Sequence, residues 1–283
     1  MKIVTSRSAL RQLSQEWRAN GQRVALVPTM GSLHQGHLML MRMAKNLAHH
    51  VVASIFVNPM QFGPDEDFSV YPRQFAEDCR LLDGEGVAAV FHPSVDEMYG
   101  PSFQTTVRVA QLAEGLCGAD RPGHFDGVAT VVCKLFQLAS PHLAIFGEKD
   151  LQQLAIVKQL VKDLNFPIEV IGHPIVREED GLAMSSRNRY LSASERQKAL
   201  CLFRAISQAR SLVAGESSTL KADAILEQAG SSIAAAGVTL DYAAVVDETT
   251  LRHDELIGPG SVLALAAKIT ERVRLIDNGR LIL

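Results

Sequence analysis

Residues 24–37, VALVPTMGSLHQGH, decide the fold of this chain. The segment begins with a short apolar run rich in β-branched side chains, which is typical of a buried strand. The run breaks at Pro28 and Gly31, and beyond His37 the apolar residues recur at spacings of three and four, as on one face of a helix. We therefore expect a strand, a tight turn and then a helix that opens at Gly36 or His37.

The predicted turn has the features of a phosphate-binding site. A helix N-terminus offers unpaired N–H groups and a partial positive charge, and His34 and His37 fall three residues apart on one side of it. Gly31 and Gly36 allow the backbone to approach an anion closely. The alternative is that both histidines only cap the helix and face water. The segment is neither a Walker A loop nor a dinucleotide-binding fingerprint.

Length and composition restrict the class of protein. The 283 residues fit one large or two medium domains, and 47% hydrophobic residues suffice to build their cores. The net charge of −3 argues against a general nucleic-acid binder. Apolar runs such as residues 51–57 are too short to span a membrane and the N-terminus lacks a signal-peptide core, so we expect a soluble cytoplasmic protein. The 4 cysteines form no C-x-x-C pair, which predicts buried free thiols.

Strands and helices alternate through the first part of the chain. A helix over residues 6–20, capped by Ser6 or Ser8, precedes the strand at 24–28. Hydrophobic periodicity predicts further strands at 51–57, 87–91, 142–146 and 168–171, and helices at 37–49, 73–84, 128–139 and 151–160. This alternation is typical of a parallel sheet with right-handed crossovers, in which ligands bind at the carboxyl ends of the strands.

The strand at 51–57 leads into a loop that carries amide side chains. Prolines and a glycine exclude regular structure over residues 58–64. Asn58 and Gln61 therefore lie near the carboxyl end of a strand, where a ligand is expected. We expect the acidic residues 65–67 to form a solvated turn.

The strand at 142–146 leads into a second polar segment. Gly147 ends this strand, and Lys149 follows in the turn, where its ammonium group can pair with phosphate. Gln152 or Gln153, at the start of the next helix, can hydrogen-bond a polar substrate.

Two other segments carry arginine. Arg121 and His124 precede the helix at 128–139, where they can present charge to an anion or form an ordinary surface turn with a cap. Residues 180–191 contain two serine hydroxyl and two guanidinium groups, which suit the outer phosphates of a nucleotide. The alternative for that loop is an interdomain linker.

The pattern changes after residue 191. Periodicity there predicts two helices, at 192–213 and 219–236, and then three strands at 238–247, 261–267 and 272–277. We expect an α/β chain, with a Rossmann-like domain over residues 1–175 and a smaller α+β domain over 176–283.

Five motifs, taken in order, resemble those of the pantothenate synthetase family. They are Pro28–Gly31 with His34-x-Gly36-His37, Asn58–Phe62, Arg121–Phe125, Gly147–Asp150 with Gln152-Gln153, and Met184–Asn188. The match extends to Arg272–Asn278 and so covers nearly the whole chain. Any one motif could arise by chance, but five in the same order and at similar intervals are specific.

The resemblance implies an HxGH nucleotidyl-transferase fold, shared with class I aminoacyl-tRNA synthetases, and a pantoate–β-alanine ligase that forms AMP. ATP would activate D-pantoate as pantoyl adenylate with release of pyrophosphate. The amine of β-alanine would then displace AMP to give pantothenate, a coenzyme A precursor. The resemblance also implies a requirement for Mg²⁺ and a homodimer. No metal ligand is predicted on the protein, and neither nucleic acid nor a membrane is an expected partner.

The same resemblance assigns roles to residues. His34, His37, Lys149 and Arg187 are the expected catalytic groups, because attack of a carboxylate on phosphorus needs charge stabilisation more than a covalent nucleophile. Asn58, Gln61 and Gln153 are the expected contacts for pantoate and β-alanine. The expected ATP site consists of Met30, Gly31, His34, Gly36, His37, Gly147, Glu148, Lys149, Asp150, Val176, Met184, Ser185, Ser186 and Arg187.

Three other functions compete with this one. A relative of the same fold could transfer AMP or CMP to a phosphorylated substrate, but Gln61 and Gln153 would then have no role. A tRNA-charging enzyme needs a basic anticodon-binding surface, which a net charge of −3 does not indicate. A nucleotide sensor would keep the phosphate site without a complete second-substrate pocket. Adenylate-forming activity separates the enzyme from the sensor.

Overall fold

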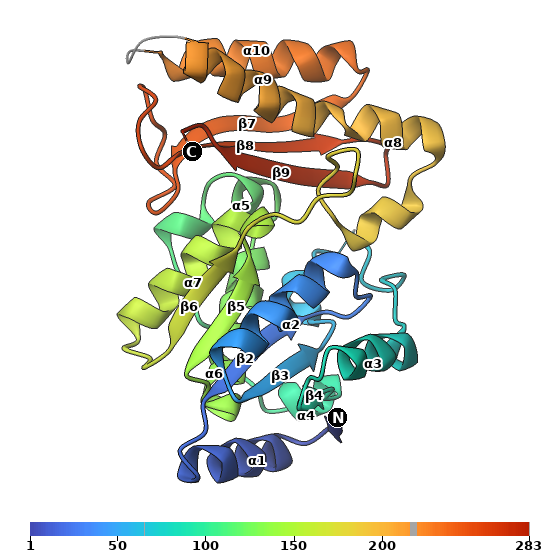
Figure 1. Ribbon diagram of the computed structural model, residues 1–283, viewed down its shortest axis with the longest axis vertical. Coiled ribbons are helices and arrows are strands. Elements are labelled where there is room, and N and C mark those ends of the chain that lie inside the picture. Colours follow the sequence, from blue (N-terminus) through green and yellow to red (C-terminus); the bar gives the residue numbers. More distant parts are fainter. Residues whose placement is uncertain (65, 216–219, 283) are drawn as a thin grey trace. The chain divides into compact units, whose positions relative to one another are not determined.

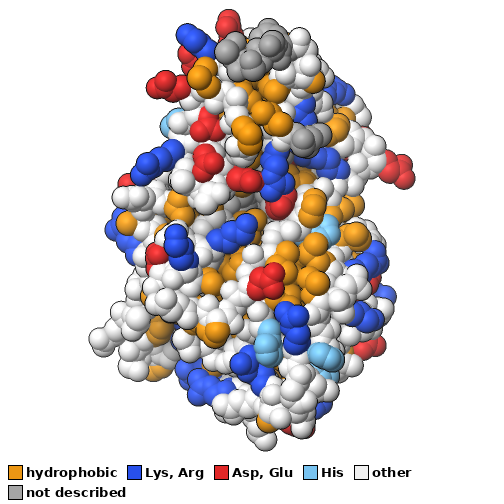
Figure 2. Space-filling model, turned by 60° about the vertical axis from the view of Figure 1, so that its left-hand side comes forward, with side chains coloured by type: hydrophobic (Ala, Val, Ile, Leu, Met, Phe, Trp, Pro, Cys, Tyr) orange, Lys and Arg blue, Asp and Glu red, His pale blue; other side chains and the backbone are white. Residues whose placement is uncertain are grey.

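The computed structural model describes residues 1–64, 66–215 and 220–282, and the chain divides into two compact units. Unit 1 comprises residues 1–114, 118–148 and 156–174, and unit 2 comprises residues 115–117, 149–155 and 175–283. Within the described ranges, no helix is both long enough and apolar enough to cross a membrane. On the face drawn in Figure 2, acidic and basic side chains are interspersed, in keeping with the balanced composition.

Unit 1 is built on a parallel sheet of 6 strands in the order β1-β4-β3-β2-β5-β6. The predicted parallel sheet is therefore confirmed. The edge strand β1 is not predicted, because it has only 3 residues and two of them are exposed, so no buried apolar run marks it. The strands are β1 Lys2–Val4, β2 Val24–Thr29, β3 His50–Ile55, β4 Ala89–Phe91, β5 Leu143–Gly147 and β6 Glu169–His173.

Helices cover both faces of this sheet (Figure 1). On one face, α2 Gln35–Leu47 and α3 Phe75–Gly84 bury side chains such as Met41 and Leu82 against alternate strand residues, including Val27. On the other face pack α1 Arg7–Ala19 and α6 His124–Ala139. The remaining elements up to β6 are η1 Pro59–Gln61, α4 Val95–Met98, η2 Gln111–Ala113, α5 Cys117–Asp120, η3 Glu148–Asp150 and α7 Leu151–Asp163.

Two of these helices begin earlier than the sequence predicts. α2 begins at Gln35, because His34 adopts an extended N-cap conformation and its N–H donates to the His37 ring. α6 begins at His124 instead of residue 128, because Gly123, with φ of 80°, turns the chain directly into the helix. The predicted Ser6 cap of α1 is confirmed by a 3.3 Å hydrogen bond from the Ala9 N–H.

Unit 2 contains an antiparallel sheet in the order β7-β8-β9, on which α9 Cys201–Gly215 and α10 Ala222–Ala235 pack (Figure 1). The single helix expected over 192–213 is instead two helices, α8 Ala193–Ala199 and α9. Residues 199–202 are all buried, and four consecutive residues cannot share one face of a straight helix. The predicted start of the next helix, at residue 219, lies outside the described residues. The strands are β7 Thr239–Asp247, β8 Ser261–Lys268 and β9 Arg274–Arg280.

The cysteines are free thiols, as predicted. Only Cys117 and Cys201 are buried, whereas Cys79 and Cys133 are half-buried, so the prediction of burial is wrong for two of them. Burial raises the pKa of the Cys201 thiol to about 11, which makes it an inert core residue.

Candidate active site

The strand order of unit 1 reverses between β2 and β5, and polar segments follow both strands. β3 lies on one side of β2 and β5 on the other, with Leu26 of β2 opposite Ala144 of β5 in a parallel pair. The strands therefore end at the same edge of the sheet, at Thr29 and Gly147. In an open parallel sheet, such a reversal is where ligands bind.

Hydrogen bonds fix the turn that follows β2. The Thr29 hydroxyl donates to the Ser54 carbonyl at 2.7 Å and accepts the Gly31 N–H at 3.2 Å. Gly31 has φ of 81°, and a Cβ atom there would lie 2.9 Å from Asp78 Oδ2. Only glycine fits this position without a shift of the carboxylate.

Asp78, in the first turn of α3, is a site residue that sequence reasoning missed. Its carboxylate accepts the N–H groups of Ser32 at 2.9 Å and Leu33 at 2.8 Å, and the residue is only 1% exposed. A buried carboxylate is tolerated when it is hydrogen-bonded in this way. The available signal was its position four residues before Leu82, which places an acid on the apolar face of the helix.

His34 and His37 lie together at the N-terminus of α2. Their ring centroids are 4.1 Å apart, and both side chains are partly exposed. His37 Nδ1 accepts the His34 N–H at 3.3 Å, so the proton of the neutral His37 ring is on Nε2. The structure thus places both histidines at a helix N-terminus, where the helix dipole favours an anion.

The orientation of the Asn58 amide is set by neighbouring groups that act clearly as hydrogen-bond donors or acceptors. Its Oδ1 accepts the Met60 N–H at 3.3 Å and the Tyr99 hydroxyl at 2.8 Å. Its Nδ2 donates to the Gly127 carbonyl at 3.0 Å. Burial raises the pKa of Tyr99, so the phenol stays a donor. Asn58 is 1% exposed, which is deeper than expected for a residue predicted to contact substrate.

Asn58 in turn orients Gln61. Asn58 Nδ2 donates to Gln61 Oε1 at 3.0 Å, which leaves Gln61 Nε2 facing Met30 Sδ at 3.3 Å. Met30 directly follows β2. Gln61 therefore presents amide N–H groups, which are hydrogen-bond donors, toward the segment that follows this strand.

The expectation of a solvated acidic turn at 65–67 is wrong for Glu66. Arg121 Nε and Nη2 donate to the two Glu66 carboxylate oxygens at 2.6 and 2.5 Å. Burial alone would raise the pKa of Glu66, but the hydrogen bonds and charge of Arg121 outweigh it and lower that pKa. Arg121 is therefore paired with Glu66. Neither of the two alternatives drawn from the sequence, contact with an anion or a surface turn with a cap, included this ion pair. Asp65 lies outside the described residues.

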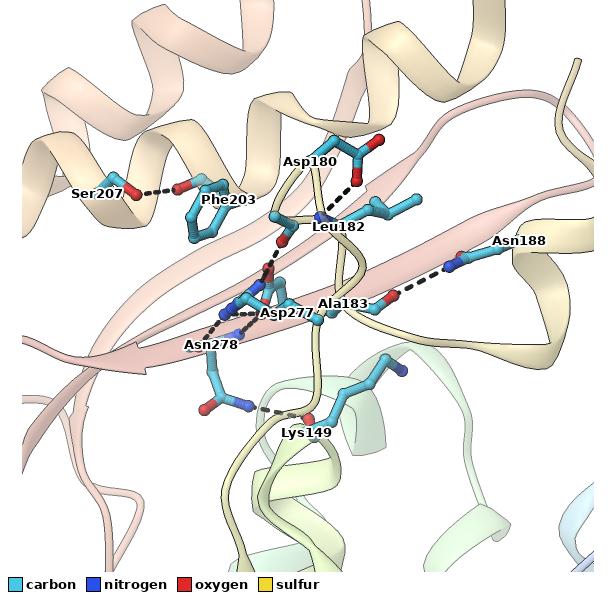
Figure 3. Close-up of polar contacts among 11 residues, drawn as sticks. Lys149, Asp180, Leu182, Ala183, Asn188, Phe203, Ser207, Asp277 and Asn278 are labelled. Carbon is cyan, nitrogen blue, oxygen red and sulfur yellow. Dashed lines mark hydrogen bonds and ion pairs between the residues drawn. The ribbon is translucent and has the colours of Figure 1, made fainter. Parts of the chain in front are cut away.

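At the carboxyl end of β5, Gly147 and Glu148 are half-buried residues of unit 1, and the segment that follows belongs to unit 2. In unit 2 the Lys149 carbonyl accepts Asn278 Nδ2 at 2.9 Å, and Figure 3 shows the Lys149 side chain extending away from this contact. Asp150 is exposed.

The two glutamines at the start of α7 differ in environment. Gln152 is 5% exposed and donates to the Gly115 carbonyl at 2.7 Å. Gln153 is half-buried. Gln152 is therefore bonded within unit 2, and Gln153 is the better candidate for a substrate contact.

Residues 176–190 of unit 2 form a hairpin and a 3-10 turn. The Met184 N–H donates to the Val176 carbonyl at 3.0 Å, and Arg177 pairs with Ala183. The hydroxyl of Ser185 caps the turn η4 Ser186–Tyr190 by accepting the Arg187 N–H at 3.3 Å. The segment is thus folded onto itself, unlike a bare linker.

Arg177 anchors this hairpin to β9, and sequence reasoning gave it no role. Its guanidinium group donates to both carboxylate oxygens of Asp277, at 2.7 and 2.9 Å, and lies 4.8 Å from the centre of the Phe203 ring. Asp277 is 3% exposed. Figure 3 labels Phe203 and Asp277, and it also shows Asn188, which donates to the Ala183 carbonyl at 3.1 Å.

The parallel sheet, with a His-x-Gly-His helix start beside its order reversal, defines an α/β protein with a Rossmann-like fold. The sequence profile described as pantoate-beta-alanine ligase matches residues 2–280. The chain belongs to the pantoate-beta-alanine ligase family.

Relatives and solved structures agree with this assignment. The chain is 50% identical over 285 residues to a pantothenate synthetase of Desulfotalea psychrophila, with 100% of both chains covered. A crystal structure of pantothenate synthetase from Thermus thermophilus has a TM-score of 0.93 and 43% identity, again with 100% of both chains covered. The pantoate-beta-alanine ligase of Francisella tularensis, solved with beta-gamma ATP and beta-alanine, has a TM-score of 0.80 and 31% identity and covers 99% of this chain and 98% of its own.

Proposed function

We propose that this ligase condenses D-pantoate with β-alanine, using ATP, through a pantoyl-adenylate intermediate. Family membership over residues 2–280 supports the overall reaction. The observation that carries the proposal is that unit 1 contains both a helix N-terminus suited to phosphate and a glutamine amide donor held in one orientation. Gln61 Nε2 faces Met30 at 3.3 Å, and Met30 leads directly into the His34–His37 turn. A nucleotide sensor would not need that amide.

In the first step, a carboxylate oxygen of pantoate attacks the α-phosphorus of ATP and pyrophosphate leaves. Negative charge grows on the phosphoryl oxygens, and donors already in place stabilise it without reorganisation. His37 Nε2–H and the N-terminus of α2 are suited to this task, and His34 adds a second imidazole. Met30 and Gly31 belong to the proposed ATP site as the segment that leads into this turn, and Gly36, which has no side chain, lets a phosphate approach the backbone of α2.

The family resemblance assigns further phosphate donors to this reaction. Lys149 is a point charge for phosphate, and Ser185, Ser186 and Arg187 offer hydroxyl and guanidinium groups. Gly147, Glu148, Asp150, Val176 and Met184 are assigned to the nucleoside and its surroundings. Gln61 and Gln153 are assigned to the hydroxyl groups and carboxylate of pantoate, and Asn58 supports Gln61.

The second step needs little acid–base help from the protein. The amine of β-alanine attacks the acyl carbon of the adenylate, the bond to AMP breaks, and the attacking nitrogen loses a proton. An acyl adenylate is already reactive, so the main requirement is that water be kept away from it.

We propose that Mg²⁺ enters with ATP. Among the residues that the structure describes, no group of three or more His, Cys, Asp or Glu side chains could hold a metal ion. The cationic and imidazole donors proposed here suit phosphate, so Mg²⁺ would take its ligands mainly from phosphate and water. A bound Mg²⁺ would neutralise part of the triphosphate charge.

We also propose a homodimer, as the family resemblance implies, and a cytoplasmic location, as the sequence pattern indicates. Sedimentation analysis of the purified chain tests the dimer, and a monomer at micromolar concentration would contradict it.

The reaction is tested by a substrate-omission assay. Sustained turnover to AMP, pyrophosphate and pantothenate in equal amounts should require pantoate, β-alanine and ATP together, whereas pantoate and ATP without β-alanine should release no more pyrophosphate than there are active sites. AMP formation that is independent of pantoate would contradict the proposal.

A further inference from the structure

We propose that Arg121 and His124 are positioning residues that hold Gln61 by its backbone carbonyl and thereby aim its amide at pantoate. The inference rests on the proposed role of Gln61 as a pantoate contact. All of the contacts that support it lie within unit 1.

The tautomer of His124 follows from its two partners. Arg121 Nη1 lies 3.0 Å from His124 Nε2, and because a guanidinium group can only donate, Nε2 is the acceptor. The ring proton of neutral His124 is therefore on Nδ1. Nδ1 lies 2.7 Å from the Gln61 carbonyl, to which it donates. The ring thus transmits the position of Arg121 to the backbone of Gln61.

Arg121 is itself held in place. It donates to Glu66 through Nε and Nη2 at 2.6 and 2.5 Å, and Nη2 also lies 3.3 Å from the Gln61 carbonyl. The side chains of Arg121 and Glu66 are 21% and 26% exposed. The Gln61 carbonyl therefore has two donors, and both are oriented by the bidentate, half-buried ion pair of Arg121 with Glu66.

The side chain of Gln61 is fixed separately by Asn58, which donates to its Oε1 at 3.0 Å. Close packing between η1 and α6 keeps the two supports together. A Cβ atom at Gly127, in the first turn of α6, would overlap the Met60 carbonyl, so α6 touches the backbone next to Gln61. With carbonyl and amide both held, Gln61 Nε2 has one direction available, toward Met30.

Loss of the carbonyl support should therefore weaken pantoate binding while ATP binding is retained. A shift of about 1 Å in a substrate-positioning group can cost up to about 10²-fold. We expect His124→Ala to raise the pantoate KM about tenfold or more, with the ATP KM within about twofold of wild type. A general loss of structure would instead lower kcat and alter both KM values.

Two isosteres sharpen the test. The amide nitrogen of asparagine occupies nearly the place of Nδ1, whereas that of glutamine occupies nearly the place of Nε2. His124→Asn should keep the donor to Gln61 and a pantoate KM within about threefold of wild type. His124→Gln should resemble His124→Ala. The matched control is His253→Asn, an exposed histidine of unit 2.

The experiment is steady-state kinetics of pantothenate formation with pantoate and ATP varied separately, on protein whose fold is checked by circular dichroism. Pantoate KM values that rise in His124→Gln but not in His124→Asn support the proposal. Equal pantoate KM values in these two variants would overturn it, even if His124→Ala does not fold. An inactive wild-type enzyme would contradict the proposed function itself, whereas active wild type with equal variants contradicts only this inference.

Discussion

Asp78 Oδ1 accepts the backbone N–H of Leu33 at 2.8 Å, and this hydrogen bond ties α3 to the turn between β2 and α2. The second carboxylate oxygen holds the neighbouring N–H of Ser32, so the turn that precedes His34 is fixed by a single side chain. A phosphate site at this turn depends on that support, because a preorganised donor must not move when charge develops.

Asp78→Asn should therefore destabilise the protein. One carboxylate oxygen becomes an NH₂ group that faces a backbone N–H, so one buried donor loses its acceptor. The free energy of unfolding should fall by about 2–4 kcal/mol, measured by urea denaturation. Asp83→Asn on the same helix is the control, because the Asp83 side chain is 67% exposed, and it should change stability by less than about 0.5 kcal/mol. Equal effects of both substitutions would refute the role of Asp78.

His37→Ala and Lys149→Ala should each lower the rate of adenylate formation by about 10²-fold or more, the usual effect of losing one transition-state donor. Single-turnover release of pyrophosphate from ATP and pantoate measures that rate. His253→Ala, at an exposed histidine, should leave it unchanged. A folded His37→Ala protein with a near-normal rate would remove His37 from the mechanism.

Gln152→Ala and Gln153→Ala should have opposite consequences although the residues are adjacent. Gln152 is buried and bonded to the Gly115 carbonyl, so its loss should lower the melting temperature more than it alters pantoate use. Gln153→Ala should raise the pantoate KM with little change in stability. Thermal denaturation combined with pantoate kinetics distinguishes the two, and a reversed pattern would mean that the assignment is wrong.

The ion pair of Glu66 with Arg121 predicts a pH-dependent contribution to stability. The pKa of Glu66 is lowered from 4.5 in the folded protein, so its stabilisation is fully present above pH 4.5 and is lost as pH falls through the folded pKa. Glu66→Gln should therefore lower the free energy of unfolding by about 1 kcal/mol at pH 7. The gap between variant and wild type should close in acid. Urea denaturation between pH 3 and pH 7 measures it, and a gap that widens in acid would contradict the pair.

Local patterns predict the parts of this fold that depend on neighbouring residues. The strand, turn and helix around Gly31 and His37 follow from periodicity and from glycine and proline positions within 14 residues. The alternation of strands and helices then limits the chain to a parallel sheet whose carboxyl edge carries the polar segments.

The remainder depends on partners that are distant in sequence. Asp78 lies 45 residues from Leu33, Arg121 lies 55 from Glu66, and Arg177 lies 100 from Asp277. In the sequence, each acid looks like an ordinary residue of a helix, turn or strand. Only the tertiary structure brings its hydrogen-bond donor close to it. The break between α8 and α9 has a similar origin. It allows the residues around the break to be buried in the core of unit 2, and no local sequence signal marks it.

The measurement that tests the central claim most directly is ATP–pyrophosphate exchange with pantoate present and β-alanine absent. Reversible formation of pantoyl adenylate predicts exchange of label between pyrophosphate and ATP that depends on pantoate. Folded enzyme supplied with Mg²⁺ that shows no such exchange, yet forms pantothenate when β-alanine is added, would contradict a free-standing adenylate step.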